Sequence, residues 1–387
     1  MEIKQIYALL NDVTSQTLGE KAVSMSDLTG LVALGNTVLN SDTTKEKWLN
    51  VLTDRIGKTI VSARAYASGS DRYLKDNFEF GAIMQKLYVE PMDAEENTSH
   101  KTAGVSVDMY VIKNPEVKQK LFSDVTAWEI DITIPDKQLK GAFVSESAMA
   151  SFIGSIFTAV ENSMEMKFEE MSNMCVANFI GERLWSHADN KGKLTVVDLL
   201  SNYKTATGDA TMTAAKALFS PDFLKYSSSQ ISKYLERMDR MSTLFNTEDY
   251  KRFTKKDDCI VTVLTDYASN FKYYLESDTY NKELVALPNY GSVPYWQGSG
   301  TDYSFSEVSK IDLTTSSGHH VTQTGVIALM TDRDALGVFK EDKKTLTAYN
   351  GKGEYTNYFN KAEIGYFNDL SENGVVFVVA DTIFTKP

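Results

Sequence analysis

Histidine and cysteine, the residues that most often bind metals or act as nucleophiles, are few in this sequence and form no cluster of ligands. His319 and His320 are adjacent, and in a strand adjacent side chains point to opposite faces, which is poor geometry for one metal ion. The only two cysteines, Cys175 and Cys259, belong to no Cys or His cluster and imply no disulfide framework. No HExxH pattern is present, so we expect neither a bound metal nor a cofactor.

Glycine and carboxylate patterns complete no catalytic motif either. The segments GSG (298–300) and GKG (351–353) are shorter than a dinucleotide-binding or phosphate-binding loop and are more typical of turns. Asp332 and Asp334 could form a carboxylate pair or part of a cation site, but this spacing at a strand end is more typical of a turn or a helix cap. The sequence has no GxSxG elbow. These patterns predict a protein that is not an enzyme.

Two aromatic-rich segments leave one chemical alternative open. The segment YNGKGEYTNYF (349–359) and the Tyr- and Asn-containing loop near 289–305 could form a platform for sugars. Aromatic residues that alternate along a strand more often fill a core or a subunit interface. A carbohydrate-binding protein or a glycan hydrolase is therefore kept as the less favoured alternative.

The composition is that of a globular protein with an acidic surface. The chain has 387 residues, of which 42% are hydrophobic and 24% charged, enough for two or three substructures with their own cores. A net charge of −12 and the lack of a basic stripe argue against tight nucleic-acid binding. No apolar stretch is long enough to span a membrane, and the first residues, MEIKQIYALLNDV, lack an apolar signal core. We expect the protein to be made and kept in a cytoplasm.

A long helix is the strongest structural signal. Between Ser147 and Leu184 apolar residues recur every three or four positions without a break, which predicts a helix about 57 Å long. The residues expected to pack along its buried face are Phe152, Ile156, Val160, Met164, Phe168, Met171, Cys175 and Phe179. Such a helix must run along an elongated molecule or across a sheet that extends with it. A coiled coil is the alternative, disfavoured by imprecise heptad spacing.

Strand-like alternation appears on both sides of a polar, turn-rich segment. Alternating apolar residues predict half-buried strands at 105–111 and 128–134, and residues 90–104 are expected to form the tip of a long hairpin or loop. Residues 43–57 predict a short capped helix, and buried strands are predicted at 258–267 and 324–332.

Several of these segments resemble a known family. They are WLNVLTDRIG (48–57), LKGAFVSESAMASFIGSI (139–156), VLTDYASNFKYYLESDTYNKEL (263–284), LPNYGSVPYW (287–296), ALMTDRDALGVF (328–339) and YFNKAEIGYFNDLSENGVVFVV (358–379). In type and order they are similar to segments of tailed-phage major capsid proteins with the Hong Kong 97-type fold, and closest to the phi-twenty-nine group of short-tailed phages. The resemblance covers about residues 43 to 380.

The resemblance implies an α+β fold with an N-terminal arm, an extended loop, a long spine helix, and peripheral and axial domains. The implied division is 1–58 for the arm and short helix, 59–110 for the extended loop, 111–195 for the peripheral domain with the spine helix, 196–335 for the axial domain, and 336–387 for strands that return to the peripheral domain and the C-terminus.

The implied function is that of a shell subunit of the virion. The family assembles in the host cytoplasm into hexamers and pentamers, which form an icosahedral or prolate head around double-stranded DNA. The implied partners are copies of the chain itself, a scaffolding protein and a portal, with no membrane. A nanocompartment shell protein of the same fold, which encloses cargo proteins, is the nearest alternative.

The resemblance also places residues 64–104 in a loop that contacts a neighbouring subunit. The charged residues of its tip, expected between subunits, are Asp93, Glu95, Glu96, His100 and Lys101. A two-stranded projection is marginally stable alone, so we expect the loop to be mobile in the monomer and ordered in the shell.

Overall fold

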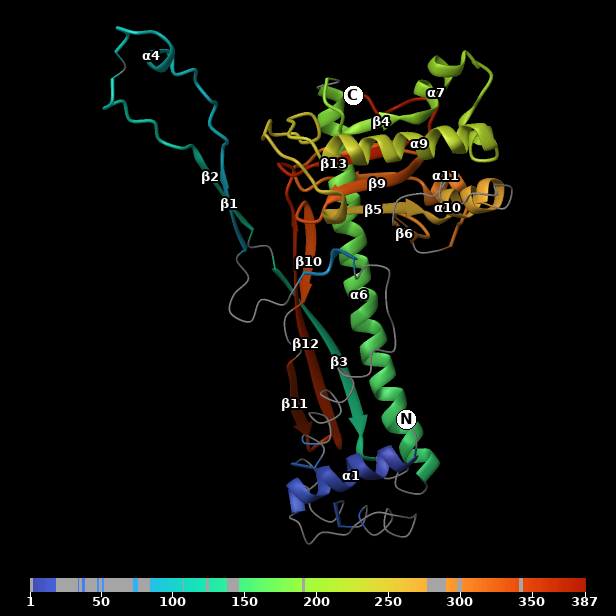
Figure 1. Ribbon diagram of the computed structural model, residues 1–387. Coiled ribbons are helices and arrows are strands. Elements are labelled where there is room, and N and C mark those ends of the chain that lie inside the picture. The colour runs from blue at the N-terminus through green and yellow to red at the C-terminus, as the bar shows by residue number, and fades with distance from the viewer. Residues whose placement is uncertain are drawn as a thin grey trace.

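The protein is an elongated α+β molecule built around one long helix (Figure 1). Figure 1 shows α6 (Glu146–Asp189) running from the end where α1 (Ile3–Leu18) lies to a five-stranded sheet at the other end. The computed structural model describes residues 3–18, 34, 37–38, 47–48, 51, 72–75, 84–106, 108–122, 125–137, 146–189, 192–276, 290–297, 301–340 and 344–387.

The long helix matches the predicted one and is slightly longer. It has 44 residues, which corresponds to about 66 Å at 1.5 Å per residue. Along its length it contacts strands of both sheets rather than a second long helix. The prediction of a helix that lies across an extended sheet is therefore confirmed, and the coiled-coil alternative does not describe its packing within this chain.

A narrow antiparallel sheet accompanies the helix over much of its length. Its central strand is β12 (Tyr355–Asn368), which pairs with β3 (Val125–Pro135) on one side. On the other side β12 pairs with β10 (Leu336–Lys340) and β11 (Lys344–Asn350). In β3 the isoleucines at alternate positions are half-buried or buried, and the polar residues between them are exposed, so the predicted half-buried strand at 128–134 is confirmed.

The central strands of the second sheet are buried on both faces. Its order is β4 (Val196–Asp198), β13 (Gly374–Val378), β9 (Val326–Asp332), β5 (Cys259–Leu264) and β6 (Tyr290–Val293). Val375 and Phe377 of β13 face a core formed with α7 (Leu199–Thr207), α9 (Pro221–Met238) and α10 (Thr265–Phe271). Val376 and Val378 face α6 and the hairpin of β7 (Ile311–Thr314) and β8 (His320–Gln323). A strand covered on both faces has an unbroken apolar sequence, as β13 and β9 do.

The remaining described elements are short. They are α8 (Ala214–Ala217), α11 (Phe305–Val308), the 3-10 turn η2 (Lys256–Asp258) and the π-helical turn η3 (Lys272–Glu276). Near α1, the buried Trp48 donates a hydrogen bond from Nε1 to Thr14 Oγ1 at 3.3 Å. The rest of the predicted capped helix at 43–57 lies outside the described residues, apart from positions 47 and 51.

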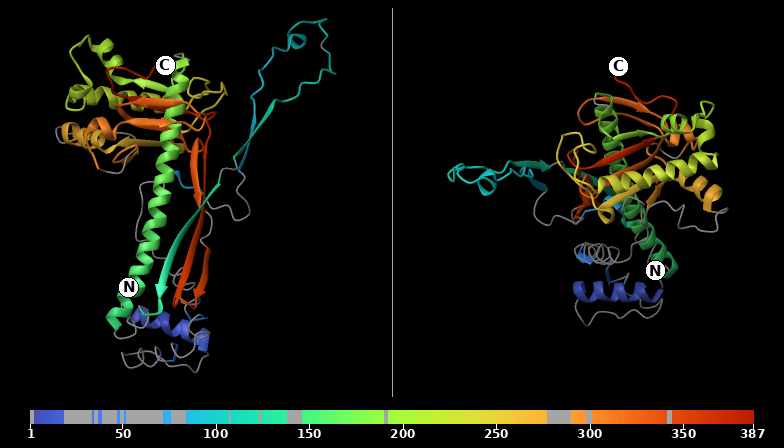
Figure 2. Two further views of the ribbon diagram at one scale, coloured as in Figure 1. Left: turned by 180° about the vertical axis from the view of Figure 1, so that it is seen from behind. Right: turned by 45° about the horizontal axis from the view of Figure 1, so that its top comes forward.

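A two-stranded hairpin projects away from the body of the molecule (Figures 1 and 2). β1 (Met84–Val89) pairs with β2 (Val117–Phe122), and the tip between them carries the one-turn helix α4 (Thr98–Lys101). The predicted strand at 105–111 is wrong. Its described residues lie in the irregular tip with exposed side chains, and none of the strands that the structure describes pairs with that segment. The strand that closes the hairpin is 117–122 instead.

Candidate functional site

The outer face of the hairpin is apolar and exposed. In β1 and β2 the residues alternate between two faces, and the face directed away from the body carries Leu87, Val89, Val117 and Leu121, each more than half exposed. Val89 lies directly opposite Val117 in the register. Gln85 and Gln119 complete this face, which is therefore mostly but not wholly apolar. An exposed apolar patch of this kind is typical of a site where another protein binds.

The tip of the hairpin extends this apolar surface. Met109 and Tyr110 are both 85% exposed, and Ile112 is 83% exposed. Met92 and Val111 are exposed by 70% and 59%. More than half of the large apolar side chains that are exposed in the described part of the chain lie between Met84 and Phe122. Figure 2 shows that this tip lies far from the body.

The charged residues of the tip pair within the chain. Glu96 pairs with Lys101, and Glu95 pairs with Lys113. Asp93 accepts a hydrogen bond from Lys251 of the body at 3.1 Å. The backbone N–H of His100 donates to Asn97 Oδ1 at 3.2 Å. All of these carboxylates are exposed, so their pairs contribute little to stability.

The inner face of the hairpin is charged and aromatic, and it contacts the body. Its residues are Lys86, Tyr88, Lys118, Lys120 and Phe122. The body presents three carboxylates to this face, which we call the acidic socket: Glu248, Asp369 and Glu372. Lys86 Nζ lies 3.1 Å from Asp369 Oδ2 and 3.5 Å from Glu372 Oε1. Lys120 Nζ lies 3.0 Å from Asp369 Oδ1 and 2.5 Å from Glu248 Oε1.

Two tyrosines and an arginine form a second contact on the same face. The rings of Tyr88 and Tyr250 are 4.7 Å apart, and the Arg252 guanidinium lies 4.5 Å from the centre of the Tyr88 ring. Lys118 Nζ lies 4.8 Å from the centre of the Tyr250 ring. Tyr88 Oη donates to the carbonyl of Lys251 at 2.9 Å. Cation–π contacts of this kind stabilise by about 0.5–1 kcal/mol at exposed sites and more when they are desolvated.

Burial and charge act in opposite directions on the socket carboxylates. Burial alone would raise the pKa of Asp369, but the nearby Lys86 and Lys120 and the Ser371 hydroxyl lower that pKa to about 2. For Glu372 burial dominates and raises its pKa, although Lys86 and Arg252 oppose that shift. Asp369 is therefore ionised at any pH near neutrality and is the fixed negative charge of the socket.

The residues predicted to pack along the long helix differ in how deeply they are buried. Met164, Phe168 and Cys175 are buried, and Val160 is half-buried. The side chains of Phe152 and Ile156 lie outside the described residues. The Sγ of Cys175 donates to Asn368 Oδ1 at 2.9 Å and is 3.4 Å from the Phe367 carbonyl, and burial raises its pKa to about 12. Cys175 and Cys259 are both free thiols.

The histidine and carboxylate pairs of the sequence have separate local contacts. His319 stacks on Trp185 with ring centres 4.1 Å apart, whereas His320 Nε2 lies 3.4 Å from Asp312 Oδ1. Asp332 Oδ1 accepts a hydrogen bond from the backbone N–H of Asp334 at 2.9 Å. This is the turn between β9 and β10, as the spacing predicted. Among the described residues no group of three or more His, Cys, Asp or Glu is placed to hold a metal ion.

The aromatic segment at 349–359 belongs mainly to a sheet. It forms the turn between β11 and β12 and their paired ends, where Tyr358 is buried. Tyr355 Oη accepts a hydrogen bond from Asn350 Nδ2 at 2.8 Å. Within the described part of the second aromatic loop, Trp296 is buried and donates from Nε1 to the Val326 carbonyl at 2.7 Å. Tyr358 and Trp296 therefore serve packing, whereas Tyr303 of the second loop is 62% exposed.

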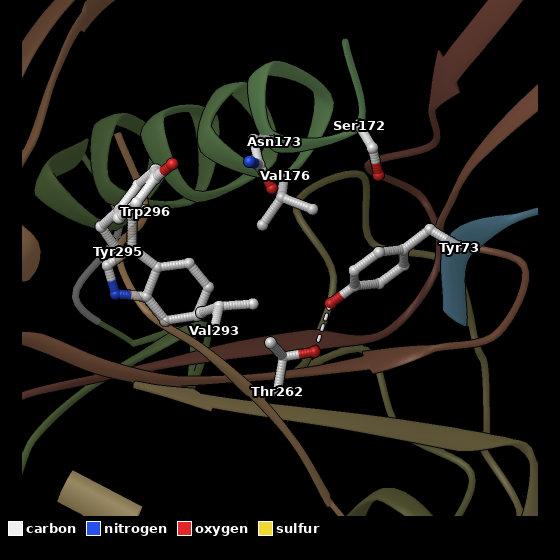
Figure 3. A pocket seen from close by; sticks show the side chains of 8 residues that line it. All are labelled: Tyr73, Ser172, Asn173, Val176, Thr262, Val293, Tyr295 and Trp296. Atoms are coloured by element: carbon white, nitrogen blue, oxygen red, sulfur yellow. Dashed lines mark hydrogen bonds between the residues drawn. The ribbon is translucent and has the colours of Figure 1, made fainter. Parts of the chain in front are cut away.

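Figure 3 shows a small cavity between α6 and the five-stranded sheet. It is lined by Tyr73, Ser172, Asn173, Val176, Thr262, Val293, Tyr295 and Trp296. Tyr73 Oη and Thr262 Oγ1 form a hydrogen bond across it, and the buried Ser172 Oγ has no hydrogen-bond partner among the described residues. A volume of about 10 Å³ has space for about one water molecule, so this cavity fits a structural water and not a substrate.

The sequence patterns did not predict the acidic socket, although one of them indicates the charged face of the strand that binds it. The segment VKQKLF (117–122) alternates apolar or neutral residues with lysines, which is the pattern of a strand with one charged face. Nothing local indicated which carboxylates would face Lys118 and Lys120, because Glu248 and Asp369 are far away in the sequence.

In the described helices no segment is long and apolar enough to cross a membrane.

Comparison with known proteins identifies the family. The model of the Phi29-like phage major capsid protein family matches residues 7–378. The major capsid protein of Bacillus phage B103 is 22% identical over 388 residues, which cover 98% of this chain and 74% of that protein. That of Bacillus phage PZA is 22% identical over 386 residues, with the same coverage.

The fold agrees with this assignment. The capsid structure of Staphylococcus phage Andhra aligns with a TM-score of 0.52 at 11% identity, covering 80% of this chain and 83% of that one. The predicted α+β fold of the Hong Kong 97 type is confirmed. With its long helix, its two sheets and its projecting hairpin, this chain belongs to the family of Phi29-like phage major capsid proteins.

Proposed function

We propose that copies of this chain assemble into the hexamers and pentamers of a phage head, and that the hairpin is a principal contact between neighbouring copies. The observation that carries this proposal is the outer face of Leu87, Val89, Val117 and Leu121. A two-stranded ribbon has no third strand to cover such a face, and exposed aliphatic side chains gain stability when a partner removes them from water.

The charged tip has a lesser part in this proposal. Asp93, Glu95, Glu96, His100 and Lys101 all lie on the projecting part of the hairpin, where a neighbour would reach them. The three carboxylates already have lysine partners within the chain. We therefore assign binding energy to the apolar face and assign register between subunits to the charges.

We also propose that the chain is divided into the regions that the family resemblance implies. It comprises an arm (1–58), an extended loop (59–110), a peripheral domain with the spine helix (111–195), an axial domain (196–335) and the returning strands (336–387). The paired strands of the hairpin extend to Phe122, which supports a later end for the loop region.

The partners follow from the family and from charge. We infer a shell that encloses double-stranded DNA and is built in the host cytoplasm with a scaffolding protein and a portal. The net charge of −12 favours a wall that does not adhere to packaged DNA. We also infer that the subunit has no enzymatic activity and needs no cofactor. Family membership favours the phage head over a nanocompartment or a carbohydrate-binding protein.

The test is to remove the tip and ask whether shells still close. Residues 90–116 are replaced by a short Gly-Ser turn, which joins Val89 to Val117, a directly opposed pair. We expect a folded subunit with an unchanged melting temperature that forms no closed shells in electron micrographs, under conditions in which the wild-type chain forms them. The control changes only tip charge, by Glu95→Gln together with Glu96→Gln, and should still form shells. Normal shells from the tip-deleted variant would contradict a contact made by the tip. Normal shells from a variant with Leu87, Val89, Val117 and Leu121 replaced by serine would contradict the contact made by the outer face.

A further inference from the structure

The hairpin carries two like charges directly opposite one another, which calls for an explanation. Lys86 of β1 and Lys120 of β2 are register partners, so both ammonium groups leave the same face of the ribbon. Like charges at directly opposed positions destabilise an antiparallel pair. A ribbon with only two strands has little stability to lose.

Asp369 resolves this repulsion by accepting from both lysines at once. Its Oδ2 lies 3.1 Å from Lys86 Nζ and its Oδ1 lies 3.0 Å from Lys120 Nζ. Ser371 also donates to Oδ1 from its hydroxyl at 2.7 Å and from its backbone N–H at 3.0 Å. The Asp369 side chain is only 1% exposed, so solvent and salt screen these pairs weakly. One carboxylate thus joins the two strands to the body.

The socket is held from behind by the long helix. Arg183 of α6 is fully buried and donates to the carbonyl of Glu372 at 2.6 Å and to that of Phe245 at 3.2 Å. These carbonyls belong to the two loops that carry the socket carboxylates. A continuous path of polar contacts therefore runs from the helix through the socket to the hairpin.

A second attachment prevents the hairpin from turning about the first. Tyr88 lies two residues beyond Lys86 along β1, which is about 7 Å farther along the strand. It is held by the Tyr250 ring, by the Arg252 guanidinium and by its hydrogen bond to the Lys251 carbonyl. A single contact would act as a pivot, whereas two contacts spaced along one strand define a direction.

We propose that the acidic socket sets the direction in which the hairpin projects from its own subunit before any neighbour binds. The inner face is a fixed mounting, and the outer face remains free for a second copy of the chain. The importance of this for assembly rests on the proposed function, but the orientation itself is a property of the isolated subunit. Binding to a neighbour then costs less conformational entropy, because the ribbon already points in one direction.

The experiment measures orientation in the unassembled, full-length subunit. Spin labels are placed on the tip at Thr102→Cys and on α9 at Lys233→Cys, both exposed positions, in a Cys259→Ser background. We expect a narrow distribution of distances between the labels, which broadens clearly in Asp369→Asn with no change in the far-ultraviolet circular dichroism spectrum. The matched control is Glu96→Gln, which removes an exposed tip ion pair and should leave the distribution narrow.

A second variant covers the case in which Asp369→Asn does not fold. Lys86→Met with Lys120→Met changes only the hairpin and removes both arms of the Asp369 bridge along with the repulsion between them. It should broaden the distribution in the same way. It should also speed amide hydrogen exchange in β1 and β2 by at least about tenfold, the factor for losing one of the two hydrogen bonds to the Asp369 carboxylate, while β9 is unchanged.

The outcomes separate this inference from the proposed function. An unchanged narrow distribution in the lysine variant, or in a folded Asp369→Asn variant, would overturn the inference even if shells form. Absence of shells from the wild-type chain would overturn the proposed function and leave the inference standing, because the measurement is made on the subunit alone.

Discussion

The strand β13 and the hairpin strand β1 use apolar residues in opposite ways. In β13 every residue is buried, and successive side chains enter two different cores. In β1 the aliphatic residues Leu87 and Val89 point to solvent, while Lys86 and Tyr88 point to the body. The difference shows that apolar content alone does not tell whether a strand serves folding or assembly. Whether a strand serves folding or assembly depends on what its alternate side chains face: a core, the body of the subunit or solvent.

The two strands also differ in what holds them. β13 is stabilised by burial of apolar surface on both faces, which does not depend on the ionisation of side chains. The hairpin is held by ion pairs, cation–π contacts and one tyrosine hydrogen bond. Substitutions in the body should therefore change the free energy of unfolding, and substitutions on the outer face of the hairpin should change assembly alone.

The largest effect on folding should come from a charge placed in the body core. Phe168 of α6 is 1% exposed, and Phe168→Asp removes its packing and leaves an unpaired buried carboxylate. Loss of the ring alone costs about 3–5 kcal/mol, and the charge adds to that cost. We expect an insoluble or unfolded chain by circular dichroism. Glu169→Ala, one residue along the helix, should stay within about 0.5 kcal/mol of wild type in chemical denaturation. A soluble Phe168→Asp variant with unchanged melting would show that this face is not the buried one.

A matched pair of glycines should give the next largest difference. Gly325 and Gly104 both have positive φ, at 78° and 88°, but a Cβ on Gly325 would lie 2.1 Å from the Val379 carbonyl oxygen, whereas nothing lies within 4 Å of one on Gly104. Gly325→Ala should lower the free energy of unfolding by more than about 2 kcal/mol, because the clash adds to a backbone strain of about 1–3 kcal/mol. Gly104→Ala carries only local strain in the tip and should leave the melting temperature of the body unchanged. Equal losses in the two variants would mean that the tip is part of the body's cooperative unit.

Acid should weaken the mounting of the hairpin and have no direct effect on β13. The pKa of Asp369 is about 2 in the folded chain, below its ordinary value of 3.8. A lowered pKa contributes stability above the unfolded value, and that contribution is lost as the pH falls from about 4 to about 2, on the order of 2 kcal/mol. Glu372, whose pKa is raised, acts in the opposite direction.

The measurement is urea unfolding at pH 5 and at pH 2.5 for the wild type and for Asp369→Asn. The variant should be less stable at pH 5, and it should lose less stability on acidification than the wild type does. Identical acid dependence of the two chains would show that the Asp369 carboxylate makes no net favourable interaction in the folded state.

The sequence predicted those elements whose patterns meet a core directly. The long helix and the strand with Trp128, Ile130, Ile132 and Ile134 were found because their apolar positions face other parts of the same subunit. The segment 105–111 has a similar alternation and was predicted as a strand, but its described side chains are exposed. Alternation of apolar and polar residues indicates that the two faces of a segment differ, but it does not indicate whether a partner strand is present.

Local sequence patterns could not predict the acidic socket, because its contacts are made by residues from distant parts of the chain. Arg183 reads as an ordinary charged residue on a helix, yet it is fully buried because it meets backbone carbonyls of Phe245 and Glu372, which arrive from distant parts of the chain. The mobility expected for the hairpin rested on its lack of a third strand. The inner face supplies a packed surface in place of that strand, and the unassembled subunit will test which expectation holds.

The smallest effect on folding should accompany a large effect on assembly. Leu87 and Leu121 are exposed by 64% and 61%, and their cross-strand neighbours are Gln119 and Gln85. Because neither leucine touches a core, replacing both by serine should change the free energy of unfolding by less than about 0.5 kcal/mol. In a shell the same two side chains would be covered by a neighbour, and each loss of about 1.4 kcal/mol in a contact raises the dissociation constant tenfold. The double variant should therefore need a much higher subunit concentration to form shells, as measured by light scattering and electron microscopy. Tyr88→Ser, which changes the neighbour of Leu87 on the inner face, should instead increase hydrogen exchange in β1. If the leucine variant assembles like the wild type while the tyrosine variant fails, the inner and outer faces have been assigned the wrong way round.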